Sequence, residues 1–186
     1  ILNRISFSGE LGYEIYTSHQ FQLKLFEEIE SNGKDLNLKL YGARALMSLR
    51  LEKNWGAWTL DFRPDFTAAE SGLDIFINWN KDFIGKEASL KEKKEGNKKK
   101  LVTMTIDTEE IDVTNDEAII KNNKCVGYIT SGGYAHHSKK SMALGYVPID
   151  LSKHNTSLDV EINGQLYKAH VTDRPLYDAN GGKMKS

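Results

Sequence analysis

The second half of the chain carries the pattern that most limits what it can fold into. Between residues 101 and 172, six short β-rich runs are separated by turn signals. The dipeptide Asn163-Gly164 separates two alternating runs and is a strong signal for a type I′ hairpin, and Asn122-Asn123 is a weaker one. Short strands at this spacing predict a compact antiparallel barrel or sandwich. The expected strands are 101–106, 117–121, 124–130, 141–147, 158–162 and 165–172, with a tight glycine turn at 131–134.

The first half of the chain mixes helical and extended patterns, so the fold class is predicted to be α+β. An amphipathic helix is expected after Ser18 and ends near Gly33, with its aromatic residues packed in a core against a sheet. A second helix is predicted at 43–53, and a turn leading into a short helix at 82–88. The expected extended runs are 4–7, 13–16, 36–40 and 73–79.

Two further segments divide the chain. Residues 54–72 form a long irregular connection, and its two tryptophans favour a functional loop over a disordered one. Residues 91–100 are dominated by lysine, which we interpret as a solvated linker. The predicted division is therefore an α+β portion at 1–90 and a small antiparallel β-barrel domain at 98–180.

Composition excludes several classes of protein. The 186 residues carry a net charge of −1, which gives no electrostatic reason to expect nucleic acid or an anionic membrane as partner. The one cysteine permits no intrachain disulfide, and no apolar run is long enough to span a bilayer. We expect a cytoplasmic protein, or one of the mitochondrial matrix in a eukaryote. The chain opens on Ile1 inside an expected strand, so we interpret it as a fragment or a processed chain.

One carboxylate and one arginine are the candidate binding residues that the pattern itself offers. Glu10 lies in a turn between Gly9 and Gly12, where it could accept two parallel N–H bonds from a flat, guanidine-like group. The alternative is an ordinary hairpin turn with a solvated glutamate. Arg50 is flanked by leucines, so it is either a surface residue or the buried partner of a carboxylate. The pattern alone favours the surface.

The residues give no catalytic group that we would defend. His136-His137 are adjacent, so on a strand they would point to opposite faces, and we expect no metal site. Cys125 lies among apolar neighbours and is expected to be a buried, inert thiol. Without further information, the residues indicate only a soluble α+β protein with a possible pocket.

An ordered series of motifs is more specific. The chain contains Gly9-Glu10-Leu11-Gly12-Tyr13-Glu14-Ile15 and then Ala45-Leu46-Met47-Ser48-Leu49-Arg50-Leu51-Glu52-Lys53. Residues 61–72, 82–88, and 130–134 with 143–147 follow in the same order. This series resembles the folate-binding aminomethyltransferase family, which includes the T protein of the glycine cleavage system. The Leu-Glu-Lys ending and the Trp58 region are most similar to the C-terminal region of dimethylglycine and sarcosine dehydrogenases, which would make the chain N-terminally truncated.

The resemblance implies a cofactor and its contacts. The family binds tetrahydrofolate in a central channel, and the carboxylate matching Glu10 binds the pterin, with the arginine matching Arg50 at the same site. Tyr13 and Trp58 would line the channel, and Tyr177 lies where the last segment of the family returns to the cofactor.

The resemblance also implies what this chain lacks. The catalytic aspartate of the family lies well before the motif that holds Glu10, and Asp61 and Asp65 belong to a different motif. We therefore expect no catalytic residue in this chain and no turnover by it alone. Some T proteins place an arginine where this chain has Asp178-Ala179, so that contact is not expected here.

The expected function is tetrahydrofolate-dependent one-carbon transfer. The chain would be the folate-binding part of an N-methyl amine dehydrogenase, with a flavin domain elsewhere, or of an aminomethyltransferase that is served by a lipoyl carrier protein. The alternatives are a folate-dependent demethylase of a methylated sulfur or oxygen compound, a non-catalytic folate-family binding protein, and a stand-alone β-domain interaction module.

Overall fold

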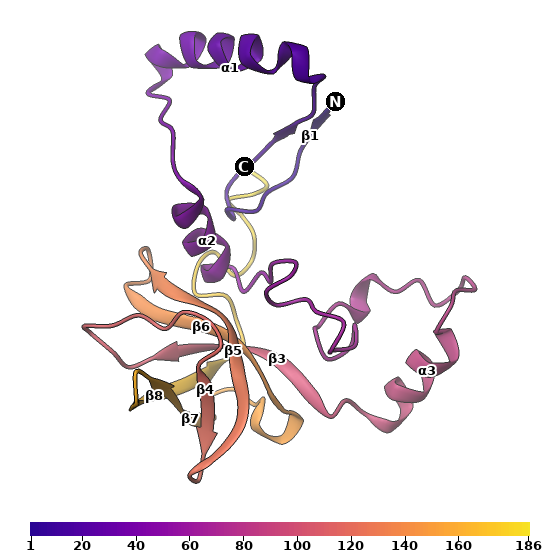
Figure 1. The fold of residues 1–186 in the computed structure, drawn as a ribbon. Helices are drawn as coiled ribbons and strands as arrows, with labels where there is room; N and C mark the ends of the chain where they lie inside the picture. Colours follow the sequence, from indigo (N-terminus) through magenta and orange to yellow (C-terminus); the bar gives the residue numbers. More distant parts are fainter.

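A closed barrel and two projecting segments make up the computed structural model, which describes all residues 1–186 (Figure 1). The barrel strands are all antiparallel to their neighbours and follow the order β3-β6-β5-β4-β7-β8. Their bounds are β3 (Lys99–Ile106), β4 (Ala118–Lys121), β5 (Lys124–Ala135), β6 (Lys140–Pro148), β7 (Ser157–Ile162) and β8 (Gln165–Thr172), with the short 3-10 helix η3 (Ile149–Leu151) after β6. The predicted antiparallel barrel is confirmed.

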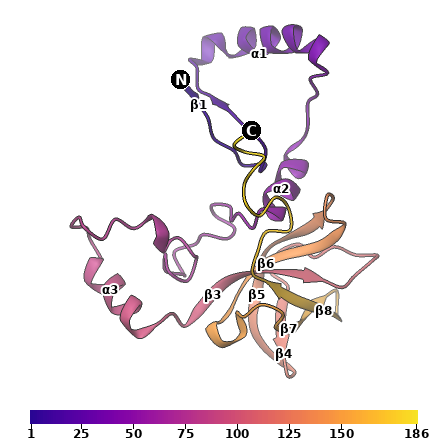
Figure 2. The same cartoon turned by 180° about the vertical axis from the view of Figure 1, so that it is seen from behind.

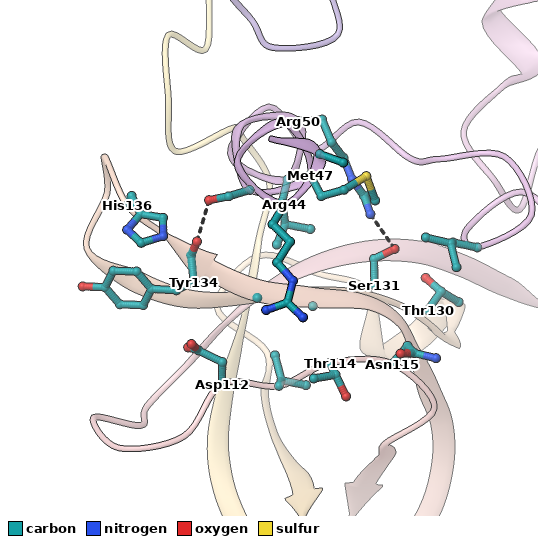
Figure 3. Close-up of a pocket in the computed structure, with 17 residues that line it drawn as sticks. Arg44, Met47, Arg50, Asp112, Thr114, Asn115, Thr130, Ser131, Tyr134 and His136 are labelled. Atoms are coloured by element: carbon teal, nitrogen blue, oxygen red, sulfur yellow. Dashed lines mark hydrogen bonds between the residues drawn. The ribbon is translucent and has the colours of Figure 1, made fainter. Parts of the chain in front are cut away.

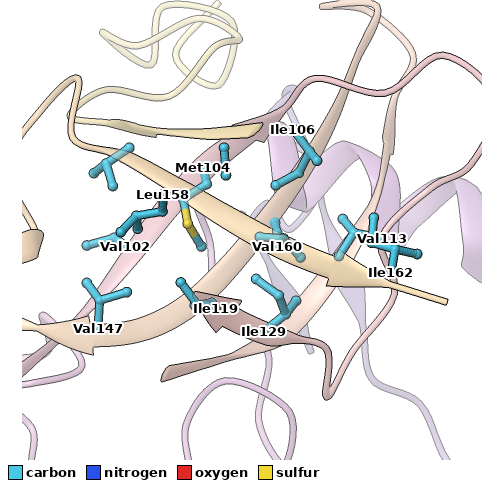
Figure 4. Packing of buried hydrophobic residues seen from close by; sticks show 13 residues of the cluster. Val102, Met104, Ile106, Val113, Ile119, Ile129, Val147, Leu158, Val160 and Ile162 are labelled. Carbon is cyan, nitrogen blue, oxygen red and sulfur yellow. The ribbon is translucent and has the colours of Figure 1, made fainter. Parts of the chain in front are cut away.

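The interior of the barrel is a single apolar core of 13 buried residues (Figure 4). Val102, Met104 and Ile106 show how it is built, because alternate residues of a strand point to the same face. Leu158, Val160 and Ile162 repeat the pattern on β7. Closure of the barrel also leaves these six strands without an open edge.

The turns of the barrel are partly as expected. Asn122 and Asn123 have φ of 51° and 59°, and Asn163 and Gly164 have φ of 51° and 78°, as a type I′ turn requires. The expected turn at 131–134 is wrong, because these residues lie within β5. A Cβ on Gly132 would lie 2.6 Å from two backbone oxygens of residues 113–114, so this glycine permits a close backbone approach.

Cys125 corrects a second expectation. It is exposed, not buried, because it is the second residue of β5 and lies next to the Asn122-Asn123 turn.

The N-terminal part of the chain stands away from the barrel (Figures 1 and 2). It holds β1 (Leu2–Asn3) paired with β2 (Glu14–Ile15), then α1 (His19–Gly33), the 3-10 helix η1 (Lys34–Leu36) and α2 (Ala43–Glu52). The two helices were predicted. The strand expected at 4–7 is wrong, because β1 lies at Leu2–Asn3 instead. The strand expected at 13–16 is limited to Glu14–Ile15, and no strand forms at 36–40. The expected packing of α1 in a core is wrong, because its apolar side chains have no sheet to cover.

A connection that packs on the barrel follows α2. Phe66 stacks on Tyr146 of β6 with ring centroids 3.4 Å apart, and the Leu101 backbone N–H donates to the Glu70 carbonyl at 2.8 Å. The loop at 54–72 is therefore irregular, as predicted, but ordered by the barrel surface. Asp61 of this loop pairs with Arg50 of α2 and accepts from Ser131 of β5, so the loop also joins α2 to the barrel.

Residues 73–98 project from the barrel in a different direction from α1, on the right in Figure 1. The strand expected at 73–79 is wrong: Asp74–Phe76 form the 3-10 helix η2, because no neighbouring strand offers an edge for pairing. The short helix expected after 82–88 is confirmed as α3 (Lys86–Glu95). Residues 91–95 end α3 and Lys99 opens β3, so the lysine-rich stretch is only partly a linker, and the domain division there stays a prediction.

Candidate functional site

The end of α2 is buried between the barrel and the rest of the chain. Arg50, Leu51, Glu52 and Lys53 each expose 3% or less of their surface. Three of these four side chains are charged, and burying a charge is costly unless it is paired and hydrogen-bonded. Each charged side chain reaches a different segment, so this helix end joins those segments to one another.

Arg50 reaches Asp61 and the barrel. Its Nη1 lies 2.9 Å from Asp61 Oδ2, and its Nη2 donates to Ser131 Oγ at 2.8 Å (Figure 3). The Asp61 carboxylate also accepts from Thr130 Oγ1 at 2.5 Å and from Ser131 Oγ at 2.9 Å. Burial lowers the pKa of Arg50, while the charge of Asp61 opposes that shift. This network fixes α2 and the following loop to β5.

The burial of Arg50 decides between the two interpretations of its sequence context. The pattern alone favoured a surface position, and that preference is wrong, because Arg50 is 2% exposed and Asp61 is fully buried. The leucines on either side of Arg50 are compatible with both positions, so they gave no signal that could separate them. Asp61, the carboxylate that pairs with Arg50, is a residue to which the sequence analysis gave no role at this position.

Glu52 holds the turn that follows β5. Its Oε1 accepts from the His137 backbone N–H at 3.0 Å. Its Oε2 accepts from the Ser138 backbone N–H at 3.0 Å and from Ser138 Oγ at 2.6 Å. The Glu52 carbonyl also accepts from the Tyr177 backbone N–H at 3.2 Å. One residue thus positions both the His137 turn and the segment after β8.

Lys53 holds that last segment by a second contact. Its Nζ donates to the Asp178 carbonyl at 2.6 Å and lies 3.6 Å from Asp178 Oδ2. Burial alone would raise the pKa of Asp178. Bonds from the backbone N–H groups of Lys183 and Gly182, together with the charge of Lys53, outweigh burial and lower this pKa. The segment is therefore anchored through an ionised carboxylate.

Glu10 and Tyr177 meet although they are 167 residues apart in sequence. The Tyr177 hydroxyl donates to Glu10 Oε1, and this hydrogen bond is the largest cause that raises the pKa of Tyr177 to about 12. Gly9 permits the meeting, because its φ is 89° and a Cβ there would lie 2.7 Å from the Lys53 side chain. Glu10 Oε2 has no hydrogen-bond partner in the chain.

Aromatic and cationic groups surround this pair. The His137 ring meets the Tyr177 ring edge-on, with centroids 4.6 Å apart. Lys53 Nζ lies 5.9 Å from the centroid of Tyr177 and 5.7 Å from that of Trp55. We call Glu10, Lys53, Trp55, His137 and Tyr177 the Glu10 cluster. It presents one carboxylate oxygen next to Tyr177, which suits a flat ligand with N–H donors.

A separate cavity of about 540 Å³ lies between α2 and β5 (Figure 3). Arg44 extends into it from α2, and Ser48 Oγ closes one side by donating to the Tyr134 carbonyl at 2.6 Å. Of the predicted site residues, only Arg50 lines it. The cavity is large enough for a small molecule.

The structure does not bring all five predicted site residues together. Glu10 and Tyr177 share one cluster, and Arg50 lies in the Asp61 network. Tyr13 is 56% exposed, and Trp58 is 77% exposed with its ring edge-on to Phe62 at 5.5 Å. No hydrogen bond or ring contact joins Tyr13 or Trp58 to the Glu10 cluster.

The structure offers neither a metal-binding cluster nor a membrane-spanning helix. The structure has no group of three or more His, Cys, Asp or Glu side chains that could hold a metal ion. None of its helices combines the length and the apolar character needed to cross a membrane.

Known protein families match both parts of the chain. Residues 1–81 match the GCVT N-terminal domain, and residues 99–178 match the glycine cleavage T-protein C-terminal barrel domain. Human mitochondrial dimethylglycine dehydrogenase is 39% identical over 175 residues, which are 93% of this chain and 20% of that protein. The 4-methylaminobutanoate oxidase (formaldehyde-forming) of Paenarthrobacter nicotinovorans is 33% identical over 98% of this chain and 22% of its own length.

A shorter relative and a solved structure match nearly the whole of the chain as well. The aminomethyltransferase of Caldanaerobacter subterraneus subsp. tengcongensis is 32% identical over 97% of this chain and 48% of that protein. The crystal structure of glycine cleavage system aminomethyltransferase T from Bartonella henselae aligns with a TM-score of 0.86 at 25% identity, over 96% of this chain and 50% of that one. The chain thus spans from a fifth to a half of these relatives. Both of its matched parts and its fold agree: residues 1–81 and 99–178 belong to the two domain families of the glycine cleavage T protein.

Proposed function

We propose that the Glu10 cluster is the pterin-binding end of a tetrahydrofolate site in a one-carbon transfer protein. The observation that carries the proposal is the arrangement of Glu10. Its carboxylate is held at a glycine turn, with one oxygen bound by the Tyr177 hydroxyl and the other without a partner. The two domain families that the chain matches support this assignment.

The residues present fit the pterin of tetrahydrofolate. A carboxylate can accept two N–H bonds from a planar ring edge that carries a ring N–H and an amine. The Tyr177 ring, whose hydroxyl bonds the carboxylate, and the His137 ring packed edge-on against it offer apolar surface at this site. When bound, tetrahydrofolate supplies the amine that takes up the one-carbon unit, and these residues bind and orient it.

The other predicted site residues take different places in the proposal. Arg50 acts by positioning, because its guanidinium is engaged by Asp61, Ser131 and the Trp55 carbonyl. It fixes the helix end from which Lys53 reaches Tyr177. We assign no ligand contact to Tyr13 or Trp58.

The proposed activity of the whole protein is transfer of a one-carbon unit to tetrahydrofolate. The names of dimethylglycine dehydrogenase and 4-methylaminobutanoate oxidase favour a donor that is an N-methyl amine, oxidised by a flavin domain, over an aminomethyl group on a lipoyl carrier. We propose that these 186 residues bind folate without turning it over, since the catalytic aspartate of the family precedes the motif of Glu10. Aminomethyl transfer to tetrahydrofolate by this chain alone would contradict that part.

Calorimetric titration with 5-formyltetrahydrofolate tests the binding site. We expect saturable binding by the chain, and we expect Glu10→Gln to weaken it by about 10-fold to 100-fold, the equivalent of ~1.5–3 kcal/mol for bonds to a charged group. Glu14→Gln is the matched control, because Glu14 lies in the same segment but bonds only the Tyr16 hydroxyl. Absence of binding, or equal affinity of Glu10→Gln and the parent chain, would refute the assignment.

A further inference from the structure

The cavity between α2 and β5 has no part in the proposed function. Its volume of about 540 Å³ is within the range of small-molecule sites. Helix α2 forms one of its walls, and residues 112–115 and 130–134 form the other (Figure 3). No residue of the Glu10 cluster lines it, so the cavity is separate from the proposed pterin site.

The two walls carry opposite charges that the chain itself leaves unpaired. The Arg44 side chain extends from α2 towards the 112–115 segment, and Asp112 lies on that segment (Figure 3). Neither side chain takes part in a hydrogen bond or an ion pair within the chain, and no ion pair joins the two. A guanidinium and a carboxylate on facing walls are complementary to a ligand that offers a carboxylate to one and an ammonium group to the other.

Arg50 adds a second unused donor to the α2 wall. It lines the cavity and is 2% exposed. Its Nη1 and Nη2 atoms have partners in the chain, but its buried Nε has none. Buried polar groups without a partner are uncommon in proteins, because they lose their hydrogen bonds to water. The α2 wall therefore lacks an acceptor, and the carboxylate end of a ligand would supply one.

The remaining lining explains what lies between the two charged ends. Met47, Leu51, Leu60 and Val113 contribute apolar side chains to the cavity, and Leu51 and Val113 are buried. A hydrocarbon side chain on the ligand would cover this surface and remove it from water. We propose that the cavity binds a zwitterionic amino acid with an apolar side chain, its carboxylate at Arg44 and its ammonium group at Asp112. The inference does not depend on folate.

A two-dimensional NMR titration of the 186-residue chain with L-leucine tests the inference. We expect saturable shifts of the backbone amides of residues 112–115 and 131–134. L-Leucine amide lacks the carboxylate and N-acetyl-L-leucine lacks the ammonium group, so each should bind at least about 10-fold more weakly than L-leucine. Arg44→Gln and Asp112→Asn should each weaken the binding of L-leucine by about 10-fold, because each removes one charged partner.

Matched controls separate the cavity from general charge effects. Arg174→Gln and Glu110→Gln change exposed residues that do not line the cavity, and both variants should bind L-leucine as the parent chain does. Arg44→Gln and Asp112→Asn should keep the amide spectrum of the folded chain, because neither side chain has a bond to lose. Absence of saturable shifts, shifts confined to other parts of the chain, or unchanged affinity in either cavity variant would overturn the inference. Failure of 5-formyltetrahydrofolate to bind would refute the proposed pterin site and leave this inference standing.

Discussion

The barrel and residues 1–42, which we call the N-terminal arm, both carry regular apolar patterns, but only the barrel buries its apolar side chains. In the barrel, alternating apolar residues point inward and close on one another, so Met104, Ile119, Ile129 and Val160 have no measurable exposure. In the arm, Phe21, Phe26 and Ile29 follow an equally regular helical spacing and remain 40% exposed or more. Regular apolar spacing is therefore found in both regions, but a core forms only where the chain supplies both of its sides.

The Glu10 cluster lies where these two regions meet. Glu10 comes from the arm, Tyr177 comes from the segment after the barrel, and Lys53 lies at the end of α2 between them. The contrast predicts which substitutions the chain tolerates and which it does not.

The largest effect is expected at the junction itself. Asp61→Ala leaves the buried guanidinium of Arg50 without its carboxylate, so we expect a loss of about 3–5 kcal/mol in the free energy of unfolding. Urea denaturation measures it, with Asp65→Ala as the control, because Asp65 is exposed in the same loop. A loss as small as that of the control would show that the network does not stabilise the junction.

The next effect compares the two regions directly. Leu158→Ala removes a side chain that is 1% exposed in the barrel core, and we expect a loss of about 2–5 kcal/mol. Ile29→Ala on α1 should change the free energy of unfolding by about 0.5 kcal/mol or less, because Ile29 is 40% exposed and belongs to neither buried apolar cluster of the chain. Equal losses in the two variants, measured by urea denaturation, would contradict the contrast.

A smaller effect is expected at Glu52. Glu52→Gln places an amide against the three donors of His137 and Ser138, at a cost of about 1–3 kcal/mol. Thermal denaturation checks this, with Glu161→Gln on the exposed side of β7 as the control. If Glu52→Gln melts at the temperature of the parent chain, the hydrogen bonds of Glu52 do not hold the turn.

The smallest effect is a pH dependence of the last segment. The folded-state pKa of Asp178 is lowered, so its stabilisation is fully present above the ordinary aspartate value of about 4 and is lost as pH falls through the lower folded value. Hydrogen exchange of residues 177–183 should therefore accelerate below about pH 4, and Asp178→Asn should remove that dependence. If the exchange of these residues accelerates equally at low pH in Asp178→Asn, the pH dependence belongs to another group.

The sequence predicted what depends on local pattern. The barrel strands, the Asn-Gly turn and both N-terminal helices follow from periodicity and turn chemistry. The turn expected at 131–134 failed because Gly132 serves a close approach to residues 113–114, which only the folded barrel creates. The strand expected at 73–79 failed because an extended run forms a strand only beside another strand.

The candidate site residues also fall into those that a local pattern predicts and those that depend on the fold. Glu10 was identified from its turn, because glycines next to a carboxylate are a local signal. The pairing of Arg50 with Asp61 and Ser131 depends on the docking of α2 on the barrel, and Ser131 is 81 residues away in sequence. Nothing in the spacing of these residues could have chosen between a surface arginine and a buried one.

A double-mutant cycle on folate affinity tests the central claim, that Glu10 and Tyr177 act as one binding unit across the junction. Affinity for 5-formyltetrahydrofolate is measured for the parent chain, Glu10→Gln, Tyr177→Phe and the double variant. We expect Tyr177→Phe to weaken binding by about 5-fold, the equivalent of ~1 kcal/mol for one hydrogen bond, and the double variant to bind no more weakly than Glu10→Gln alone. Two losses that multiply in the double variant would show that Glu10 and Tyr177 contribute independently, and would contradict the account.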